Sequence, residues 1–209
     1  MLYTVIDREH WPRKEYFEHY LHTVPCTYSM TVEIDITSVR QKKLKLYPTI
    51  LYFLAKTVNG MEQFRMSFRT NGELVLYETM SPCYTVFHKE TKTFSNLWTE
   101  YASQYSEFCR RYDKDIACFG AIEAMNAKPY QPENCFTVSM LPWAAFESFH
   151  LHVDGYEYLR PIFTLGKYRE KDGRYWLPMA VQVHHAVCDG YHVCSFIEAF
   201  QNAVCALDL

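Results

Sequence analysis

Two adjacent histidines near the end of the chain, His184 and His185, are followed at short spacing by Asp189 and Gly190. Apolar and polar residues alternate from Ala180 to His185, and this pattern predicts a half-buried strand that ends at the histidine pair. Successive side chains of a strand point to opposite faces, so only one of the two histidines can face a given pocket. Imidazole, with an unperturbed pKa of about 6.5, is a natural general base near neutral pH. The pair therefore predicts one histidine that transfers protons and one that is structural.

The stretch at 184–190, HHAVCDG, resembles the HHxxxDG signature of CoA-dependent acyltransferases. With the following Tyr-His it is similar to the chloramphenicol O-acetyltransferase family of the trimeric type. Further blocks occur in that family's order, and together they cover essentially the whole chain: WPRKEYFEHY, EIDIT, YTVFHKETKTFSNLW, PEN, SMLPW and PIFTLGKY. The resemblance implies the CoA-dependent acyltransferase fold and a homotrimer with active sites at the three subunit interfaces.

The resemblance also implies a role for each catalytic candidate. His185 is the expected general base, with its second ring nitrogen held by a backbone carbonyl, and Arg13 is expected to pair with Asp189 and hold the loop. Ser139 is expected to donate to the tetrahedral oxyanion, and Thr164 to contribute through a bound water. Each candidate also has an ordinary explanation. These are a structural histidine for His185, a helix N-cap for Asp189, a solvated helix charge for Arg13, a polar strand residue for Ser139 and a strand-forming residue for Thr164. The transfer is expected to be direct, in a ternary complex without an acyl-enzyme.

Substrate contacts are implied by the same resemblance. The expected acceptor pocket is Tyr20, Cys26, Tyr28, Phe94, Phe149 and Leu151. The expected acetyl-CoA contacts are Trp143 and Tyr168 along the donor tunnel, with Lys45 and Lys167 near the phosphates. The alternatives are that the apolar residues belong to the core and that the lysines are merely solvated. Tyr28 stands where some members have phenylalanine, so its hydroxyl must find a partner or water.

The elements that must position these residues can be predicted from periodicity and turn signals. Strands are predicted at 25–36, 83–88, 134–141 and 146–153; hairpins at Thr70-Asn71-Gly72 and Lys171-Asp172-Gly173; helices at 11–20, from Tyr47 to Asn59-Gly60, at 95–112 and after Gly190; residues 120–133 are irregular. The early helix is expected to carry Pro12 at its first position. The prediction is one mixed α/β domain over residues 1–209, with an antiparallel-rich sheet and flanking helices.

Composition limits the class of protein. The chain has 209 residues, of which 49% are hydrophobic, so it can bury the core of one domain. A net charge of −3 gives no electrostatic basis for binding nucleic acid or an anionic membrane. No apolar run approaches the roughly 20 residues that span a bilayer, and the N-terminal residues lack a signal pattern, so a cytoplasmic protein is expected.

Metal and disulfide chemistry are not expected. The eight cysteines include no C-x-x-C pair, and in a cytosolic chain they are expected to be small buried hydrophobes. His150 and His152 share the phase of one predicted strand, but no carboxylate or cysteine spacing completes a known zinc site. Transfer from an activated thioester also needs no Lewis acid.

The predicted function is acetyl-CoA-dependent O-acetylation of chloramphenicol at its primary hydroxyl. One alternative keeps the chemistry and changes the acceptor to another alcohol, an amine or a dihydrolipoyl thiol; the absence of an Ala/Pro-rich linker weakens the last of these. A second alternative is a non-catalytic trimer that binds hydrophobic ligands. The presence of His185, Asp189, Arg13 and Ser139 together argues against that alternative.

Overall fold

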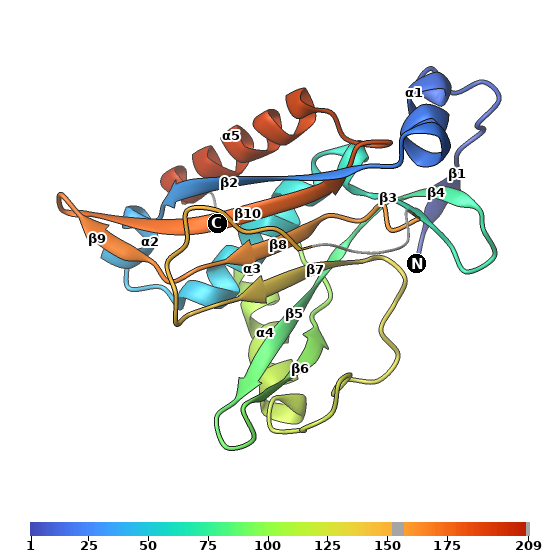
Figure 1. Cartoon of the computed structure of the whole chain (residues 1–209). Helices are drawn as coiled ribbons and strands as arrows, with labels where there is room; N and C mark the ends of the chain where they lie inside the picture. The colour runs from blue at the N-terminus through green and yellow to red at the C-terminus, as the bar shows by residue number, and fades with distance from the viewer. Residues whose placement is uncertain (152–156, 208–209) are drawn as a thin grey trace.

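A computed structural model describes residues 1–151 and 157–207, and its centre is a large mixed β-sheet (Figure 1). Among these residues the sheet has seven strands in the order β2-β10-β8-β7-β5-β6, with β9 paired to β10. The strands are β2 (Thr27–Asp35), β5 (Ser81–His88), β6 (Thr93–Trp98), β7 (Cys135–Met140), β8 (Ile162–Leu165), β9 (Arg169–Lys171) and β10 (Arg174–His184). Strand β7 pairs in parallel with β5 and β8, and the remaining pairs are antiparallel. The predicted antiparallel-rich mixed sheet is confirmed.

Helices pack against one face of this sheet and bury an aromatic core. They are α2 (Thr37–Gln41), α3 (Leu46–Asn59), α4 (Tyr105–Phe119) and α5 (Gly190–Ala206). Phe163 of β8 stacks on Phe196 of α5 at 5.2 Å between ring centroids, and Tyr84 of β5 lies 5.3 Å from Tyr112 of α4. The four rings join the sheet to two different helices, so the core is continuous across the helical layer.

A smaller sheet and short helices lie at one edge of the molecule (Figure 1). Its strands, in the order β1-β4-β3, are β1 (Tyr3–Val5), β3 (Met66–Phe68) and β4 (Leu74–Tyr77). The short helices are α1 (Lys14–Glu18), a π-helical turn η1 (His19–Thr23) and a 3-10 turn η2 (Glu62–Phe64). The segment α1–η1 leads directly into β2, and it is therefore the N-terminal segment that can reach the end of β10.

Both predicted hairpin turns are present. Strands β3 and β4 pair across a turn in which Gly72 has φ +83°. Strands β9 and β10 pair across Asp172 and Gly173, with φ 52° and 73°. Positive φ at both central residues is what a tight two-residue hairpin requires, and Asp-Gly supplies it with little steric cost. Helix α3 ends at Asn59 and α5 begins after Asp189, as predicted.

Three predicted elements differ from the structure. Residues 95–112 do not form one helix: Thr93–Trp98 is strand β6, paired with β5, and helix α4 begins at Tyr105. Leu97 and the first two tyrosines that follow it are spaced four residues apart, which is typical of a helix. Ser95, Leu97 and Thr99, however, are buried and alternate with more exposed residues, which is typical of a strand. Residues 93–98 form a strand because they pair with β5. The early helix begins at Lys14 instead of residue 11, so Pro12 precedes the helix and is not its first residue, and the segment continues as η1.

The predicted strand at 146–153 is wrong for residues 146–151, which form no strand, and residues 152–153 lie outside the described residues. A strand needs a neighbouring backbone with free ladder positions. Here the amide of Phe149 donates instead to the side-chain Oγ1 of Thr31 at 3.3 Å. Alternation in the sequence therefore did not produce a strand within this chain.

The cysteines only partly follow the prediction of buried, hydrophobe-like thiols. All eight are free, and Cys83, Cys135 and Cys188 are buried. Three others are exposed: Cys118, Cys194 and Cys205. These lie on helices α4 and α5, at positions that face away from the core.

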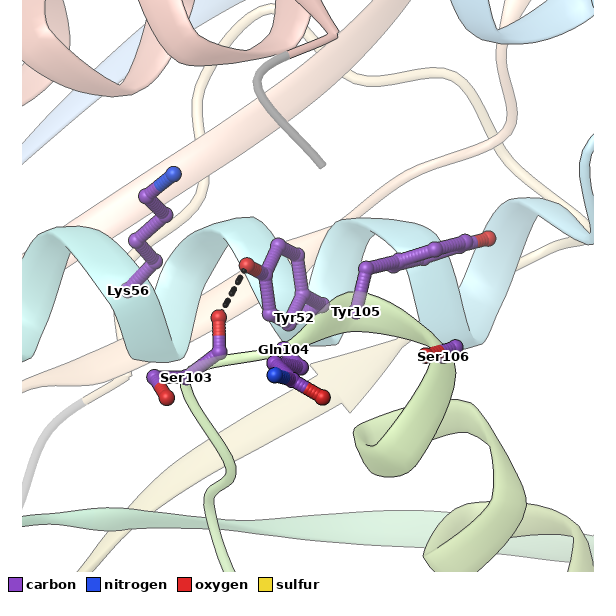
Figure 2. A pocket seen from close by; sticks show the side chains of 6 residues that line it. All are labelled: Tyr52, Lys56, Ser103, Gln104, Tyr105 and Ser106. Atoms are coloured by element: carbon purple, nitrogen blue, oxygen red, sulfur yellow. Dashed lines mark hydrogen bonds between the residues drawn. The ribbon is translucent and has the colours of Figure 1, made fainter.

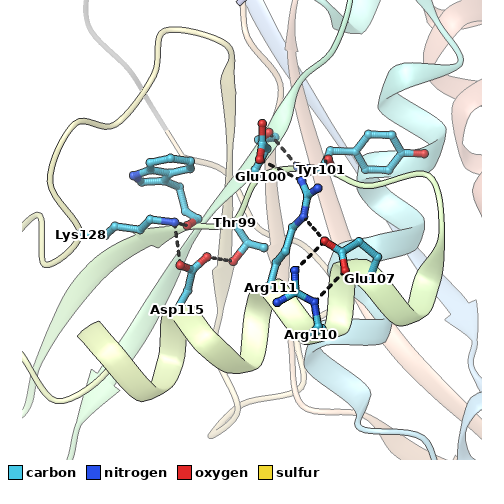
Figure 3. A network of polar contacts seen from close by, with 10 residues as sticks. Thr99, Glu100, Tyr101, Glu107, Arg110, Arg111, Asp115 and Lys128 are labelled. Atoms are coloured by element: carbon cyan, nitrogen blue, oxygen red, sulfur yellow. Dashed lines mark hydrogen bonds and ion pairs between the residues drawn. The ribbon is translucent and has the colours of Figure 1, made fainter.

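A polar network ties α4 to the end of β6 (Figure 3). Lys128 Nζ donates to Asp115 Oδ1 at 2.7 Å and to the carbonyl of Trp98 at 3.0 Å, and it lies 3.7 Å from the indole centroid. Thr99 Oγ1 donates to the other oxygen of Asp115 at 2.8 Å. Nearby, hydrogen bonds from Arg110 and Arg111 lower the pKa of Glu107 to about 2. A hollow of about 530 Å³ beside these residues is lined largely by charged side chains that form ion pairs. The ion pairs and hydrogen bonds in its walls hold α4 against the end of β6.

A second hollow, of about 370 Å³, lies between α3 and the start of α4 (Figure 2). Tyr52 points across it and donates its hydroxyl proton to the carbonyl of Ser103 at 2.7 Å.

No helix among the described residues has the length and hydropathy to cross a membrane.

Candidate active site

The histidine pair lies at the end of β10, and its two members occupy different environments. His184 is 1% exposed, and its Nδ1 accepts the amide proton of Ala186 at 3.1 Å. The side chain of His185 is 28% exposed, and its backbone amide donates to the carbonyl of Cys26 at 3.0 Å. The predicted division into one buried and one accessible histidine is present.

Arg13 links the early helix to the loop after β10. Nη1 and Nη2 each donate to one oxygen of Asp189 at 2.7 Å. Nε donates to the carbonyl of Ala186 at 2.8 Å, and Nη2 also reaches the carbonyl of His185 at 3.1 Å. The hydrogen bonds from Arg13 hold the pKa of Asp189 below its usual value. The predicted Arg13–Asp189 pair is therefore present, and the same guanidinium also fixes the backbone of His185.

The imidazole of His185 is enclosed on two sides by aromatic rings. Tyr20 stacks on it with centroids 3.8 Å apart and an interplanar angle of 5°, and Tyr28 meets it edge-on at 5.3 Å. The hydroxyl of Tyr28 donates to the carbonyl of Cys188 at 3.3 Å, which supplies the partner that this hydroxyl needs. Burial raises the pKa of Tyr28 and also that of the Cys26 thiol, so both stay protonated near neutral pH.

One ring nitrogen of His185 faces the protein. Nδ1 is buried and lies 3.3 Å from Oδ1 of Asp189. Among the described residues it forms no hydrogen bond to a backbone carbonyl, which is the partner the family resemblance implied. Asp189 is the N-cap of α5, so both explanations of this residue apply at once. This arrangement leaves Nε2 as the nitrogen available to a substrate.

A cavity of about 450 Å³ lies between β5, β6, β7 and the segment after β7. Three of the residues that line it, Phe94, Ser139 and Trp143, were predicted from the sequence as site residues. It is lined further by Thr85, Phe87, Lys92, Asn96, Met125, Thr137, Met140 and Leu141. The walls are largely apolar with a few hydroxyl and amide groups, which suits an aromatic ligand with a small number of polar anchors.

Most of the residues that line this cavity were not predicted from the sequence. Asn96 comes from the part of β6 that was predicted as helix, and Met125 comes from the irregular segment at 120–133. The alternation in Thr85 and Phe87 does indicate a shared strand face. It carries no information on which other strands lie beside that face, so the cavity could not be assembled from it.

His185 and Ser139 are far apart within one chain. Ser139 is aligned with Thr164 of β8, which is aligned with Ala180 of β10. His185 is five residues beyond Ala180, which corresponds to about 16 Å along the strand, and two strand spacings add about 10 Å across the sheet. The separation is therefore about 19 Å. A single chain does not bring the candidate base to the candidate oxyanion donor.

The remaining acceptor candidates divide between these places. Tyr20, Cys26 and Tyr28 surround His185, whereas Phe94 lines the cavity with Ser139. Phe149 and Leu151 lie on the segment after β7, where the Phe149 amide bonds to β2, and Leu151 is 41% exposed. The six predicted residues thus do not form one pocket within the described chain.

The four acetyl-CoA candidates also differ in environment. Trp143 is 61% exposed and meets Phe87 edge-on at 4.6 Å, and the backbone amide of Lys167 donates to the carbonyl of Ala144 at 2.8 Å. Tyr168 lies under the guanidinium of Arg40 at 5.0 Å. Trp143, Lys167 and Tyr168 are thus neighbours along two adjoining segments.

Lys45 is the fourth candidate, and it precedes helix α3. Its Nζ donates to both carboxylate oxygens of Asp113 on α4, at 2.9 Å and 3.0 Å. Any phosphate bound by Lys45 would therefore have to compete with this exposed ion pair.

The Arg13–Asp189 geometry gives a first prediction. We expect Asp189→Asn to lower turnover by roughly tenfold, because an amide cannot accept two charge-assisted hydrogen bonds and Arg13 is then left partly unpaired. The measurement is steady-state acetyl transfer, with circular dichroism to confirm folding. Glu9→Gln, an exposed carboxylate change near the same helix, is the matched control. Normal turnover in Asp189→Asn would contradict a positioning role for the pair.

Comparison with known proteins adds a family relationship. A family model described as chloramphenicol acetyltransferase matches residues 1–201. A chloramphenicol acetyltransferase from Vibrio anguillarum is 50% identical over 208 residues, covering 99% of this chain and 96% of the relative. One from Campylobacter coli is 53% identical over 203 residues, covering 97% of this chain and 98% of the relative.

Two solved structures have the same fold. A chloramphenicol acetyltransferase superimposes with a TM-score of 0.85 at 24% identity, covering 97% of this chain and 100% of that one. A dihydrolipoamide acetyltransferase of Azotobacter vinelandii gives a TM-score of 0.69 at 16% identity, covering 90% and 85%. These likenesses show the fold of CoA-dependent acyltransferases, as predicted.

Proposed function

This chain belongs to the chloramphenicol acetyltransferase family, and we propose that it transfers the acetyl group of acetyl-CoA to the primary hydroxyl of chloramphenicol. The observation that carries the proposal is the environment of His185: one ring nitrogen is turned into the protein beside Asp189, and the ring is clamped by Tyr20. An imidazole held in this way has one nitrogen free to exchange protons with a bound substrate. Acetylation of the hydroxyl inactivates the antibiotic, and the reaction is proposed to take place in the cytoplasm.

In the proposed reaction His185 accepts the hydroxyl proton as the hydroxyl oxygen attacks the thioester carbonyl. The tetrahedral intermediate carries negative charge on the former carbonyl oxygen, to which Ser139 donates a hydrogen bond, with Thr164 acting through water. The intermediate collapses with cleavage of the carbon–sulfur bond. The imidazolium then returns its proton to the departing thiolate, and the products are the acetyl ester and free CoA. No acyl-enzyme is formed.

The separation of His185 from Ser139 supports a site shared between copies of the chain. Each copy carries a base half, formed by His185 with Arg13, Asp189, Tyr20 and Tyr28. Each also carries an acceptor half, the cavity that contains Ser139, Phe94 and Trp143. About 19 Å separates the halves in one chain, far beyond hydrogen-bond reach. A closed homotrimer would let each copy supply its base half to one neighbour and its acceptor half to the other.

Acetyl-CoA is proposed to approach the acceptor half from the side of Trp143, Lys167 and Tyr168. Trp143 is exposed and lines the same cavity as Ser139, so the thiol-bearing arm of acetyl-CoA passing along its ring would bring the acetyl group to the Ser139 hydroxyl. Lys167 is exposed, and its ammonium group could pair with a phosphate as a point charge. Lys45 is retained as a second phosphate contact that would exchange its pairing with Asp113.

The choice of acceptor is tested by product analysis. We expect incubation with acetyl-CoA and an equimolar mixture of chloramphenicol, dihydrolipoamide and a primary amine to yield acetylchloramphenicol alone, modified at the primary hydroxyl, as read by mass spectrometry and proton NMR. The apolar walls of the 450 Å³ cavity favour the aromatic acceptor. Preferential acetylation of the thiol or the amine would overturn the proposed acceptor while retaining the chemistry. Absence of any acetylated product would favour a non-catalytic binder.

A further inference from the structure

His192, the third residue of helix α5, makes a hydrogen bond that the catalytic scheme above does not use. Its Nδ1 accepts the backbone amide proton of Asp189 at 2.9 Å. In the common capping box this third position is a glutamate or glutamine, whose side chain accepts the proton of the N-cap amide. Here an imidazole performs that task, so the acceptor is itself titratable near neutral pH.

The hydrogen bond requires a neutral ring. Nδ1 can accept a proton only if it carries a lone pair, so the proton of the neutral imidazole must be on Nε2. Burial of the ring lowers the pKa of His192 below its usual value, with Asp189 opposing the shift and Arg13 contributing to it. The neutral form is therefore favoured in the folded protein at pH 7.

His192 is connected to the base through three consecutive sets of hydrogen bonds. It holds the amide of Asp189, the carboxylate of Asp189 holds both terminal nitrogens of Arg13, and Arg13 donates to the carbonyls of His185 and Ala186. A change in the conformation of the turn at Asp189 would therefore shift the backbone of His185, which carries the catalytic imidazole. His192 itself does not touch the reacting atoms in this arrangement.

Protonation would disturb this chain of contacts in a defined way. The charged groups that act on His192 are Asp189 in its own turn and Arg13 from the start of α1; Tyr191 contacts the ring edge-on at 5.8 Å. A proton on Nδ1 would oppose the amide of Asp189. It would also be attracted to Oδ2 of that carboxylate, 3.7 Å away, in competition with Arg13.

We propose that His192 is a positioning residue for the transfer reaction: its neutral imidazole holds the turn that carries Asp189 and so maintains the orientation of His185. This inference rests on the proposed acetyl transfer. The direction of the pH effect follows from linkage. Since the folded pKa of His192 is lowered, the unfolded chain binds more protons, so the stabilisation is present above about pH 6.5 and is lost as the pH falls through the folded pKa.

Three variants test this role. His192→Gln keeps an acceptor for the Asp189 amide and removes the titration, whereas His192→Ala removes both; His10→Gln, at a side chain that is 85% exposed, is the control. At pH 8 we expect His192→Gln and His10→Gln to retain turnover within about threefold and His192→Ala to lose roughly tenfold in kcat, the equivalent of one cap hydrogen bond. The KM for acetyl-CoA should change little.

The pH profile separates positioning from simple stability. Below pH 6.5, kcat of the unmodified protein should show an additional loss of up to about tenfold, because protonation of His192 removes the acceptor for the Asp189 amide. In His192→Gln this additional loss should be absent, because glutamine does not titrate. Equal turnover of the glutamine and alanine variants at pH 8, or a profile unchanged in His192→Gln, would overturn the inference.

A second measurement does not depend on the variants folding. In the intact protein labelled with 15N-aspartate, the amide resonance of Asp189 should shift with a single pKa below 6.5 as its acceptor is lost, and an amide that does not titrate would overturn the inference. Lack of transfer by the unmodified protein at pH 8 would instead count against the proposed function, so the two failures are distinguishable.

Discussion

Mixing two inactive variants, His185→Ala and Ser139→Ala, is expected to restore acetyl transfer. Each lesion lies in a different half of the site, and the halves are about 19 Å apart in one chain. If neighbouring copies complete each other, random assembly of equal amounts gives sites in which an intact base half meets an intact acceptor half. In a closed ring this holds for about a quarter of the sites. Loss of the Ser139 donor alone should cost about 100-fold or more in kcat, so the gain is large.

The experiment requires subunit exchange, by joint refolding from denaturant or by co-expression with two affinity tags. The matched control mixes His185→Ala with Asp189→Asn, two lesions within the same base half. That mixture should show only the mean of its two parents, because no pairing of subunits restores an intact base half. Recovery in the control, or no recovery in the His185→Ala and Ser139→Ala mixture, would contradict a site shared between copies.

Replacement of His185 by alanine is the second large effect. We expect kcat to fall by about 10²–10⁴-fold, because the chloramphenicol hydroxyl then has no base to take its proton. The oligomer should remain folded: the backbone amide of His185 still bonds to Cys26, and Arg13 still bonds to the carbonyls. Size-exclusion chromatography and chloramphenicol binding by calorimetry separate the loss of chemistry from the loss of structure.

His22→Ala is the matched control for this variant. His22 belongs to the π-helical turn that also carries Tyr20, but its side chain is 61% exposed and contacts Glu18 instead of the site. Its kcat should be unchanged. A His185→Ala variant with normal turnover and normal binding would require another group to be the base.

Much of the base half could be predicted before the structure was known. The strand ending at the histidine pair, the Asp-Gly turn and the periodic helix are local patterns, and each is present as β10, the loop and α5. The pairing of Arg13 with Asp189 spans 176 residues, and periodicity alone could not have predicted it. It came from the family resemblance, in which both partners stand in matching contexts.

The acceptor half could not be predicted in the same way. Its cavity depends on strand order, since β7 lies between β8 and β5 and brings Ser139 beside residues of β5 and β6 that are distant in sequence. Residues 95–98 have a pattern compatible with either a helix or a strand, and pairing with β5 decides between them. The distance between His185 and Ser139 likewise follows from register, which no local pattern encodes.

The most direct measurement is release of free thiol from acetyl-CoA by the purified protein, recorded with a thiol-reactive chromophore in the presence and absence of chloramphenicol. We expect release that depends on chloramphenicol, is stoichiometric with acetylated product, and is negligible without an acceptor. Release at the same rate without chloramphenicol would mean thioester hydrolysis instead of transfer. No release under either condition would contradict the proposal that this chain acetylates chloramphenicol.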